Sequence, residues 1–302
     1  MRHKTVRRNA ADWKNELAYL VMLSPFFILF FIFILLPVGS SVVLSLFHYD
    51  TLTPPSFVGM ENYLRMFMDD EAFLTVLKNT LFFAIVTGPG GFALAFLMAW
   101  CINEFPRGLR TFFSFLIYSP ALAGGGYLFW KILFSGDSYG YLNSVLLSFG
   151  LITEPVQWLR DSQYITGIVL LVQLWSSMGI SFLANMAGLQ NVGEDMYEAG
   201  AIDGIRNRWQ ELWYITLPSM RSMLLFSAVM QIASSYSVGA VAKEMAGYPS
   251  VNNTVDTIIA HLGEVGTVRY EYGYAAAISV FLFALMAITR FLIDRVLNAA
   301  GR

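Results

Sequence analysis

The sequence has few charged residues and only one cysteine. Of its 302 residues, 13% are charged, whereas a soluble domain of this size carries about 25%. Cys101 has no partner for a disulfide, and its apolar neighbours predict a small buried side chain. The net charge of −2 gives no support for nucleic-acid binding. These shortages exclude a disulfide-rich secreted domain and argue against an ordinary soluble protein.

Hydrophobic residues are abundant instead, at 56% of the chain. A helix needs about 18 or more uncharged residues to cross a bilayer. Windows without Asp, Glu, Lys or Arg reach that length at Leu17–Tyr49, Asn79–Asn103, Thr111–Trp130, Ser162–Gly193, Ser222–Ala242 and Tyr272–Thr289. They predict an all-α integral membrane protein with six transmembrane helices, at about 18–46, 80–102, 111–133, 164–187, 217–241 and 272–293. No small-residue cleavage site follows the first window, so we expect a retained helix and not a signal peptide.

The six predicted spans leave more Lys and Arg residues on one side of the membrane than on the other. Most of the 19 lie in the termini and in the loops after the second and fourth spans. Loops rich in Lys and Arg stay in the cytoplasm, so both termini are expected there, with a basic N-terminal tail at 1–16. The sequence thus predicts a multi-pass protein of the cell membrane, plasma or inner, embedded in the lipid bilayer.

Three longer loops then face outward, at 46–78, 134–161 and 243–271. Ser138–Thr153 is too short and polar for a span and predicts an outer loop or surface helix. Asp69–Glu71 indicates a solvated acidic patch, with contact to a binding protein as the alternative. His48 and His261 lie too far apart in the chain to predict a metal site.

Two glycine-rich segments, Gly88–Gly91 and Gly124–Gly126, are expected to break the second and third spans. In a membrane, the freed backbone groups survive only where protein or a water-filled cavity covers them. A flexible gate or cavity wall is one interpretation, and close helix packing through small residues is the other.

The stretch Tyr197–Met220 is polar, although it lies between two strongly apolar spans. Glu194 and Asp195 suit the first turn of a helix, where acidic groups favour the positive end of the helix dipole. We therefore expect a short helix over Glu194–Asp203, ended by Gly204 in a left-handed conformation.

A second short helix is expected from Arg206 to about Tyr214, and Pro218 suits the first turn of the fifth span. The product is a helix–turn–helix at the cytoplasmic surface, and small residues such as Ala199 and Gly200 would let another protein approach closely. An amphipathic helix resting on lipid headgroups is the alternative. The excess of acidic residues speaks against it, because the inner leaflet is anionic.

This segment resembles the EAA loop of the permease subunits of ATP-binding cassette (ABC) importers. The residues Glu198-Ala199-Gly200, Gly204 and Ile215–Pro218 follow that pattern, although the family usually has alanine at the position of Gly200. Ile202-Asp203-Gly204 has the form usual in the carbohydrate branch. Further segments that resemble maltose-type sugar permeases are Phe57–Gly59 with Asn62-Tyr63, Gly247–Pro249 with Thr254, and Gly273–Ala277.

The resemblance implies the type I ABC importer permease fold over 17–300, with a cytoplasmic coupling loop at 188–217 between the fourth and fifth helices. The helix Glu194–Asp203 would dock on an ATPase subunit. The residues implied in coupling are Glu198, Ala199, Gly200, Asp203, Gly204, Leu217 and Pro218. The implied partners are a second, homologous permease in a heterodimer, two cytoplasmic ABC ATPase subunits and an extracytoplasmic solute-binding protein.

The chain itself is expected not to be an enzyme, and ATP and Mg would be bound by the partner ATPases. Gly188 and Gly193 have the glycine spacing of a phosphate-binding loop. Glu194 and Asp195 follow where that motif needs Lys and Ser or Thr. No cofactor is therefore expected in this chain.

Neutral polar residues within the fourth and fifth spans are the candidates for solute contact. The spans hold almost no ionisable groups, whereas an ion-coupled carrier commonly places one in mid-membrane. Amides, hydroxyls and aromatic rings suit a carbohydrate, and the candidates are Gln173, Trp175, Gln231, Ser235 and Tyr236. Hydrogen bonding between helices is the alternative role for these groups. Other open alternatives are a permease for glycerol phosphate or a polyamine, a stand-alone secondary carrier and, more distantly, a membrane enzyme.

Overall fold

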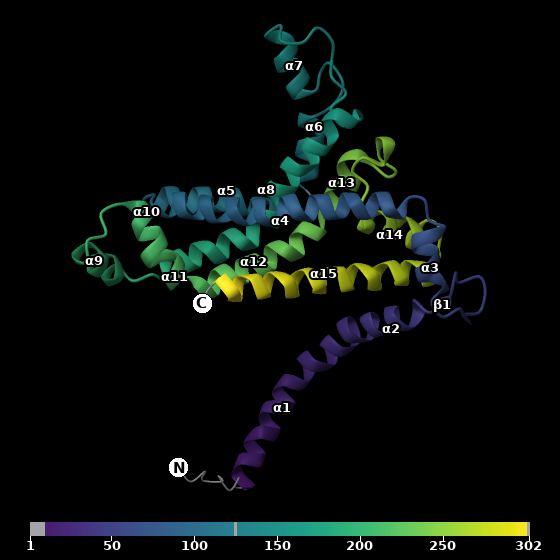
Figure 1. Ribbon diagram of the computed structural model, residues 1–302, viewed down its shortest axis with the longest axis horizontal. Coiled ribbons are helices and arrows are strands. Elements are labelled where there is room, and N and C mark those ends of the chain that lie inside the picture. The colour runs from purple at the N-terminus through teal and green to yellow at the C-terminus, as the bar shows by residue number, and fades with distance from the viewer. Residues whose placement is uncertain (1–9, 124–125, 301–302) are drawn as a thin grey trace.

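The computed structural model describes residues 10–123 and 126–300, which are almost entirely helical (Figure 1). A bundle is formed by α4 (Phe73–Asn103), α8 (Ser162–Gln190), α12 (Arg221–Tyr236) and α15 (Tyr272–Ala300). One end of the bundle carries α9 (Glu194–Ile202), α10 (Arg208–Glu211) and α11 (Leu217–Ser219). The other end carries β1 (Phe47–His48), β2 (Ser56–Phe57), α3 (Glu61–Met68) and α14 (Ile258–Thr267).

The two short strands pair antiparallel, with Phe47 opposite Phe57, and close the segment between the first helix and α3. Two more helices, α6 (Tyr127–Leu133) and α7 (Tyr141–Ser148), project from the bundle, and α13 (Val238–Ala246) lies beneath them (Figure 1). The predicted outer segment Ser138–Thr153 thus contains a short helix, α7, and no span.

Helices α4, α8 and α12 pack closely because small residues of α4 face the other two. Ala95 and Ala99 are fully buried with Phe182 of α8 in one core cluster. Gly91 has no room for a side chain, since an added Cβ would overlap the amide of Gln231 in α12. The predicted break at Gly88–Gly91 is wrong: α4 continues through Pro89. These glycines provide close packing, which was the alternative interpretation.

The third predicted span is divided in the structure. Helix α5 (Arg107–Ala123) ends just before the second glycine segment and α6 begins just after it. Gly124 and Gly125 themselves lie outside the described residues. Within the part described, the continuous helices long and apolar enough to span a membrane are Tyr19–Leu44, Phe73–Asn103, Ser162–Gln190, Arg221–Ala246 and Tyr272–Ile293. The helices Ser162–Gln190 and Tyr272–Ile293 lie within a few residues of the predicted spans 164–187 and 272–293, whereas α12 and α13 together begin and end later than the predicted 217–241.

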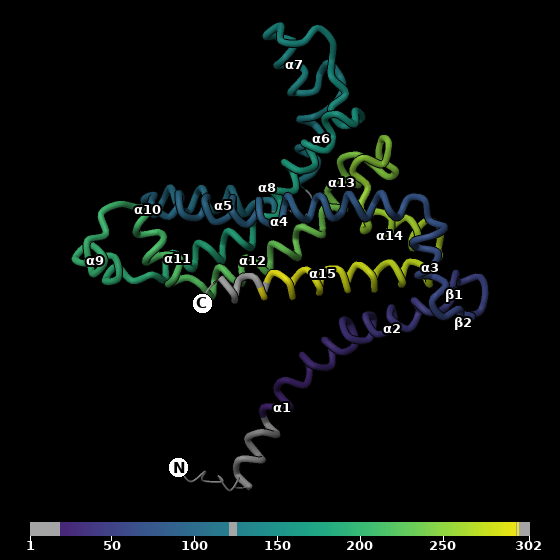
Figure 2. The backbone as a smooth tube through the Cα atoms, in the orientation of Figure 1, coloured from purple at the N-terminus to yellow at the C-terminus, as the bar shows by residue number. Residues whose placement is uncertain are grey.

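The first helix leaves the bundle. It consists of α1 (Ala10–Phe30), a π-helical turn over Phe31–Leu35 and α2 (Leu36–Leu44), and only α2 lies along α15 (Figure 2). None of the most hydropathic window of Tyr19–Leu44 is buried. An apolar helix left this bare requires lipid or another protein around it.

Two sequence expectations about single residues are wrong. Cys101 is exposed and not buried, because it lies on the side of α4 that the other helices leave uncovered. Asp70 is not part of a solvated patch: its carboxylate accepts hydrogen bonds from the hydroxyl of Tyr274 at 2.6 Å and the backbone N–H groups of Ala72 and Phe73. Its Oδ2 also lies 2.8 Å from Nε2 of His261, which is buried in α14.

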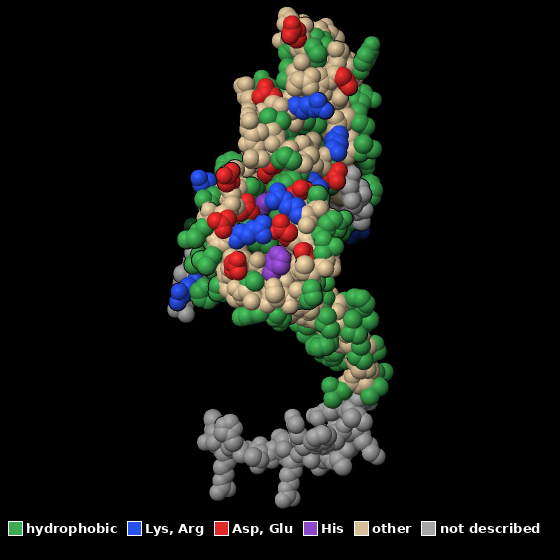
Figure 3. All heavy atoms as spheres, turned by 90° about the vertical axis from the view of Figure 1, so that its right-hand side faces the viewer, with side chains coloured by type: hydrophobic (Ala, Val, Ile, Leu, Met, Phe, Trp, Pro, Cys, Tyr) green, Lys and Arg blue, Asp and Glu red, His purple; other side chains and the backbone are tan. Residues whose placement is uncertain are grey.

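Tyr274 and His261 lie far from Asp70 in the chain, so no local pattern predicts these two contacts. Burial alone would raise the pKa of Asp70, but the hydrogen bonds from Tyr274 and His261 outweigh burial and lower the pKa below its ordinary value. Arg65 pairs with Glu271 and lies over the ring of Tyr274, which ties α3 to the start of α15. Figure 3 looks onto this end of the molecule, where acidic and basic side chains gather while the flanks are hydrophobic.

Candidate functional site

The polar stretch forms the short helix that the sequence predicts. Helix α9 covers Glu194–Ile202, with Glu194 and Asp195 in its first turn. It ends at Gly204, whose φ of 95° is left-handed. The N–H of Ile205 donates to the carbonyl of Gly200, and the N–H of Gly204 to that of Ala201. This pair of bonds is a Schellman motif, so the chain must turn sharply after α9.

The segment after the turn differs from the single second helix that was expected. Asn207 caps α10, which is followed by a π-helical turn over Leu212–Thr216 and then by α11. Pro218 lies at the start of α11, and α12 begins only at Arg221. The expected place of Pro218 in the first turn of the fifth span is therefore wrong, because Met220 adopts a non-helical conformation between the two helices.

Helix α9 is folded back onto the π-helical turn. The hydroxyl of Tyr197 lies 3.0 Å from that of Thr216. An added Cβ on Gly200 would lie only 2.5 Å from Cδ1 of Ile215, so a larger residue here would have to displace the end of that side chain. Gly200 is buried against the chain itself, beside Ile215 and Ile205. α9 and the π-helical turn before α11 therefore form one unit.

This unit is also fixed to the loop between α4 and α5. Arg208 forms ion pairs with Glu211 in α10 and with Glu104 after α4. The rings of Trp100 and Trp209 are 5.4 Å apart. Because α9 follows α8 after three residues and α11 leads into α12, a force on α9 acts directly on the ends of two bundle helices.

The other residues implied in coupling lie at or near the surface. Glu198, Ala199, Asp203, Gly204 and Pro218 are exposed, and Leu217 is half-buried. Beside them Ile202 has 87% of its surface exposed. The free face of α9 thus presents acidic groups, small residues and the exposed side chain of Ile202.

The candidate solute residues mostly bond between helices. The amide of Gln173 donates to the carbonyl of Ser234 at 2.9 Å. The amide of Gln231 donates to the carbonyl of Thr87 and the hydroxyl of Ser177, each at 3.0 Å.

Ser181 and Ser227 exchange hydroxyl-to-carbonyl bonds one turn further along. These bonds form a polar seam between α8 and α12, with Gln231 also reaching α4.

The remaining candidates occupy different places. Ser235 donates to its own helix, and Tyr236 is buried with its hydroxyl 2.7 Å from that of Thr289 in α15. Trp175 is half-buried with its ring 5.4 Å from that of Trp130. The structure thus brings Gln173 and Gln231 into one seam but leaves Trp175 and Tyr236 outside it.

Part of the seam lacks partners. The side-chain amide of Asn185 and Oε1 of Gln231 are buried and make no hydrogen bond within the described residues. The acceptor at Thr87 was missed at the sequence level, because it is a backbone carbonyl within an apolar helix and such a group carries no sequence signal of its own.

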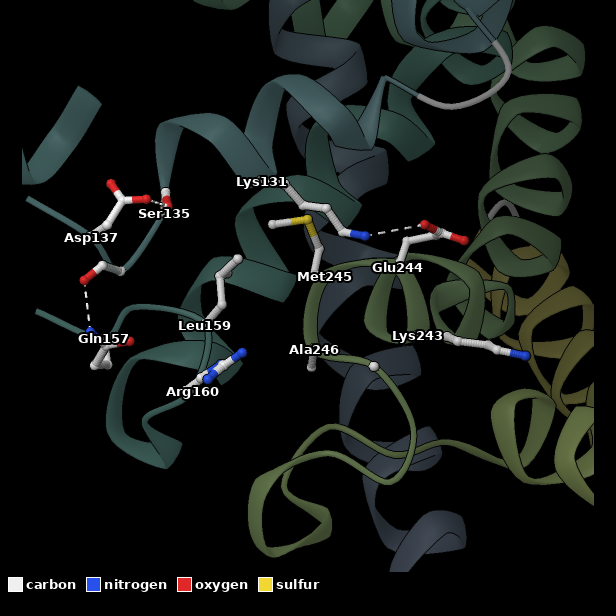
Figure 4. A pocket seen from close by; sticks show the side chains of 12 residues that line it. Lys131, Ser135, Asp137, Gln157, Leu159, Arg160, Lys243, Glu244, Met245 and Ala246 are labelled. Carbon is white, nitrogen blue, oxygen red and sulfur yellow. Dashed lines mark hydrogen bonds and ion pairs between the residues drawn. The ribbon is translucent and has the colours of Figure 1, made fainter. Parts of the chain in front are cut away.

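A surface pocket of about 540 Å³ was also not foreseen (Figure 4). It is lined from α6 and the following loop, from the turn before α8, and from the end of α13. The lining residues are Lys131, Ser135, Gly136, Asp137, Gln157, Leu159, Arg160, Lys243, Glu244, Met245, Ala246 and Gly247. They come from segments more than eighty residues apart, and no local pattern predicts that they meet.

A known family matches most of the membrane region. The family described as "Binding-protein-dependent transport system inner membrane component" matches residues 91–300. The arabinooligosaccharide transport system permease AraP of Bacillus subtilis is 29% identical over 283 residues, which cover 91% of this chain and 87% of that protein.

Two crystal structures of a bacterial ABC transporter for alginate share the fold. In the first, described as importing the acidic polysaccharide alginate, a chain with 23% identity superposes with a TM-score of 0.79 over 97% of this chain and 99% of its own length. In the second, solved in complex with an alginate pentasaccharide-bound periplasmic protein, the identity is also 23% and the TM-score is 0.76, with 98% of each chain covered. The present chain therefore belongs to the family of binding-protein-dependent transport system inner membrane components.

Proposed function

We propose that the chain is one of two permease subunits of a carbohydrate ABC importer, with both termini and α9 in the cytoplasm. Its family makes it a membrane-spanning transport component and not an enzyme. The observation that carries the proposal is α9, an exposed helix with a fixed glycine turn, built onto the ends of α8 and α12.

In this proposal α9 docks in a groove on a cytoplasmic ATPase subunit. Ile202 supplies the apolar contact and Glu198 the charged one, since both are exposed on the same short helix. ATP binding and hydrolysis take place on the ATPases, and closure of the two ATPases moves α9. The ion pairs of Arg208 and the contact of Gly200 with Ile215 pass that movement to the bundle.

The second permease covers the bare first helix. Tyr19–Leu44 has no buried residue in its most hydropathic window, and α1 diverges from its own bundle (Figure 2). A homologous subunit that packs along this helix would bury it, and the two chains together would enclose the pathway.

The solute proposed for the pathway is a mono- or oligosaccharide. The relative AraP is named for arabinooligosaccharides, and the polar seam presents amides and hydroxyls without charge. We assign solute contact to Gln173, Trp175, Gln231, Ser235 and Tyr236, with the seam opening when the two permeases move. Oε1 of Gln231 accepts no hydrogen bond within the described residues, so this atom is available to accept one from a sugar hydroxyl.

Co-purification tests the docking role of α9. The chain is expressed with the neighbouring transport genes, as wild type and with Glu198→Lys, Gly204→Leu or the control Glu71→Lys. Glu71 is exposed at the opposite end, so its variant carries the same charge change away from α9. We expect wild type and control to retain an ATPase and a second permease, and the two α9 variants to lose only the ATPase. A wild-type chain that purifies alone and moves solute without ATP contradicts the proposal.

A further inference from the structure

The pocket beside α6 and α13 lies at the far end of α8 from the coupling loop. Arg160 lies two residues before α8, and the 29 residues of that helix extend roughly 43 Å before α9 follows. The pocket therefore opens on the outer side when α9 faces the cytoplasm. Two outer segments build it together, one ending at Arg160 and the other beginning at Lys243.

Some of the charged side chains in the pocket form ion pairs and others do not. Nζ of Lys131 lies 3.5 Å from the carboxylate of Glu244, and both groups remain about half exposed. The carboxylate of Asp137 accepts a hydrogen bond from Ser135 at 2.9 Å. Among the described residues, no carboxylate lies within ion-pair distance of Arg160. Figure 4 shows its guanidinium reaching toward α13, while Lys243 extends away from it.

The wall that carries Arg160 is held in place by one buried side chain. The amide of Asn143 donates to the carbonyls of Ser135, Asp137 and Val156. Its oxygen accepts from the N–H of Val156 and from Nε1 of Trp158 at 2.8 Å.

Further hydrogen bonds fix the turn that leads to Arg160. The side-chain amide of Gln157 donates to the backbone carbonyl of Gly136 at 2.7 Å. The backbone carbonyl of Gln157 accepts from the backbone N–H of Arg160 at 3.0 Å. The guanidinium therefore projects from a preformed wall, which lowers the ordering cost of binding a partner.

We propose that this pocket receives a carboxylate side chain of the extracytoplasmic solute-binding protein, with Arg160 as its cationic contact. The inference rests on the proposed function, because a binding-protein-dependent importer needs a docking surface on this side. A guanidinium pairs with a carboxylate through two parallel hydrogen bonds, and Lys131 adds positive charge nearby. None of the lining residues is aromatic, so the pocket lacks the ring surface on which a sugar stacks.

The affinity of the binding protein for the complete transporter in lipid nanodiscs tests this assignment. Arg160→Glu is expected to weaken binding at least about tenfold, since it places like charges together. Arg269→Glu is the matched control, because Arg269 is also exposed on the outer side and the charge change is the same. It is expected to alter affinity less than about twofold.

Glu244→Gln provides a gain-of-affinity test. It removes the anion that pairs with Lys131, so the incoming carboxylate meets more positive charge and binding is expected to tighten about threefold. A change that only damaged the loop would not tighten binding. Unchanged melting temperatures of Arg160→Glu and Glu244→Gln establish that the fold is intact.

Three results overturn the inference. Unchanged affinity in Arg160→Glu excludes the contact. If Arg160→Glu and Arg269→Glu weaken the affinity of the binding protein equally, the effect comes from the overall surface charge and not from a specific contact with Arg160. Unchanged affinity together with lost uptake of a carboxylated oligosaccharide assigns the pocket to the solute. By contrast, a wild-type assembly that binds no binding protein and transports without ATP contradicts the proposed function itself.

Discussion

At the scale of single residues, the structure leaves no space for a side chain at Gly273. Its N–H donates to the carbonyl of Tyr49 at 3.1 Å, where α15 begins beside β1. An added Cβ would overlap the backbone carbonyl of Phe47, which cannot move aside like a side chain. Gly273→Ala is expected to destabilise the outer end by about 1–3 kcal/mol.

A melting curve of the detergent-solubilised protein measures this effect. Gly263→Ala is the control, because its nearest neighbour is the flexible end of Lys243 at 3.9 Å. A melting temperature that falls equally in both variants, or in neither, would contradict the steric account of Gly273.

Asp70 makes the same end of the molecule sensitive to acid. Hydrogen bonds from Tyr274 and His261 lower its pKa in the folded state, despite its burial. The carboxylate therefore stabilises the fold at pH values above its unfolded pKa of about 3.9. This contribution is lost as the pH falls through the lower, folded pKa.

Asp70→Asn is the corresponding test. It removes the titrating group, so its melting temperature is expected to lie below that of the wild type at pH 7, and the difference should shrink toward pH 3. Melting curves at several pH values measure both effects. A constant difference across this range would show that Asp70 does not titrate as described.

At the scale of elements, the loop between α6 and α8 is organised by Asn143. It is fully buried and makes five hydrogen bonds to Ser135, Asp137, Val156 and Trp158. Each such bond contributes about 1 kcal/mol. Asn143→Ala is expected to open this loop locally, because the bundle below it does not depend on these bonds.

Limited proteolysis detects such opening. Cleavage within 134–161 should become at least about tenfold faster in Asn143→Ala, as a loss of more than 1.4 kcal/mol in local stability requires. Asn191→Ala, at an exposed position after α8, is the control and should leave this rate unchanged. Faster cleavage throughout the chain would mean that Asn143 supports the whole fold.

The sequence predicted elements better than their contacts. Charge-free windows indicated α4, α8, α12 with α13, and α15, because only helices satisfy their backbone groups in a membrane. Helix α9 was also predicted, since acidic residues and Gly204 mark its ends locally. The continuity of α4 through Pro89 was not, because glycine and proline together are local signals for a break, whereas the close packing of Gly91 against Gln231 of α12 joins residues distant in the chain.

The candidate sites, too, could be predicted only where they depend on a local sequence pattern. The exposed face of α9 could be predicted from a local motif, whereas the inward position of Gly200 depends on Ile215. The partners of Asp70 and the pocket around Arg160 combine residues distant in the chain, and a single sequence does not reveal such pairs. The bonds that the amides of Gln173 and Gln231 make between helices likewise join residues distant in the chain.

At the scale of the whole molecule, the proposed second permease would cover the first helix. Phe33 is 70% exposed in the middle of an apolar helix that its own bundle does not cover. A photo-crosslinking amino acid at this position is expected to capture the second permease when both chains are expressed. The product should be absent when this chain is expressed alone, and capture of lipid only in both cases would contradict the paired arrangement.

We propose that α9 couples this permease to ATP hydrolysis on its partner subunits. Solute uptake into proteoliposomes that contain both permeases, the ATPases and the loaded binding protein tests this coupling. We expect ATP-dependent uptake that Glu198→Lys and Gly204→Leu reduce at least about tenfold, while Glu71→Lys retains it. Uptake that proceeds without ATP, or that the α9 variants leave intact, would show that α9 does not couple the permease to the ATPases.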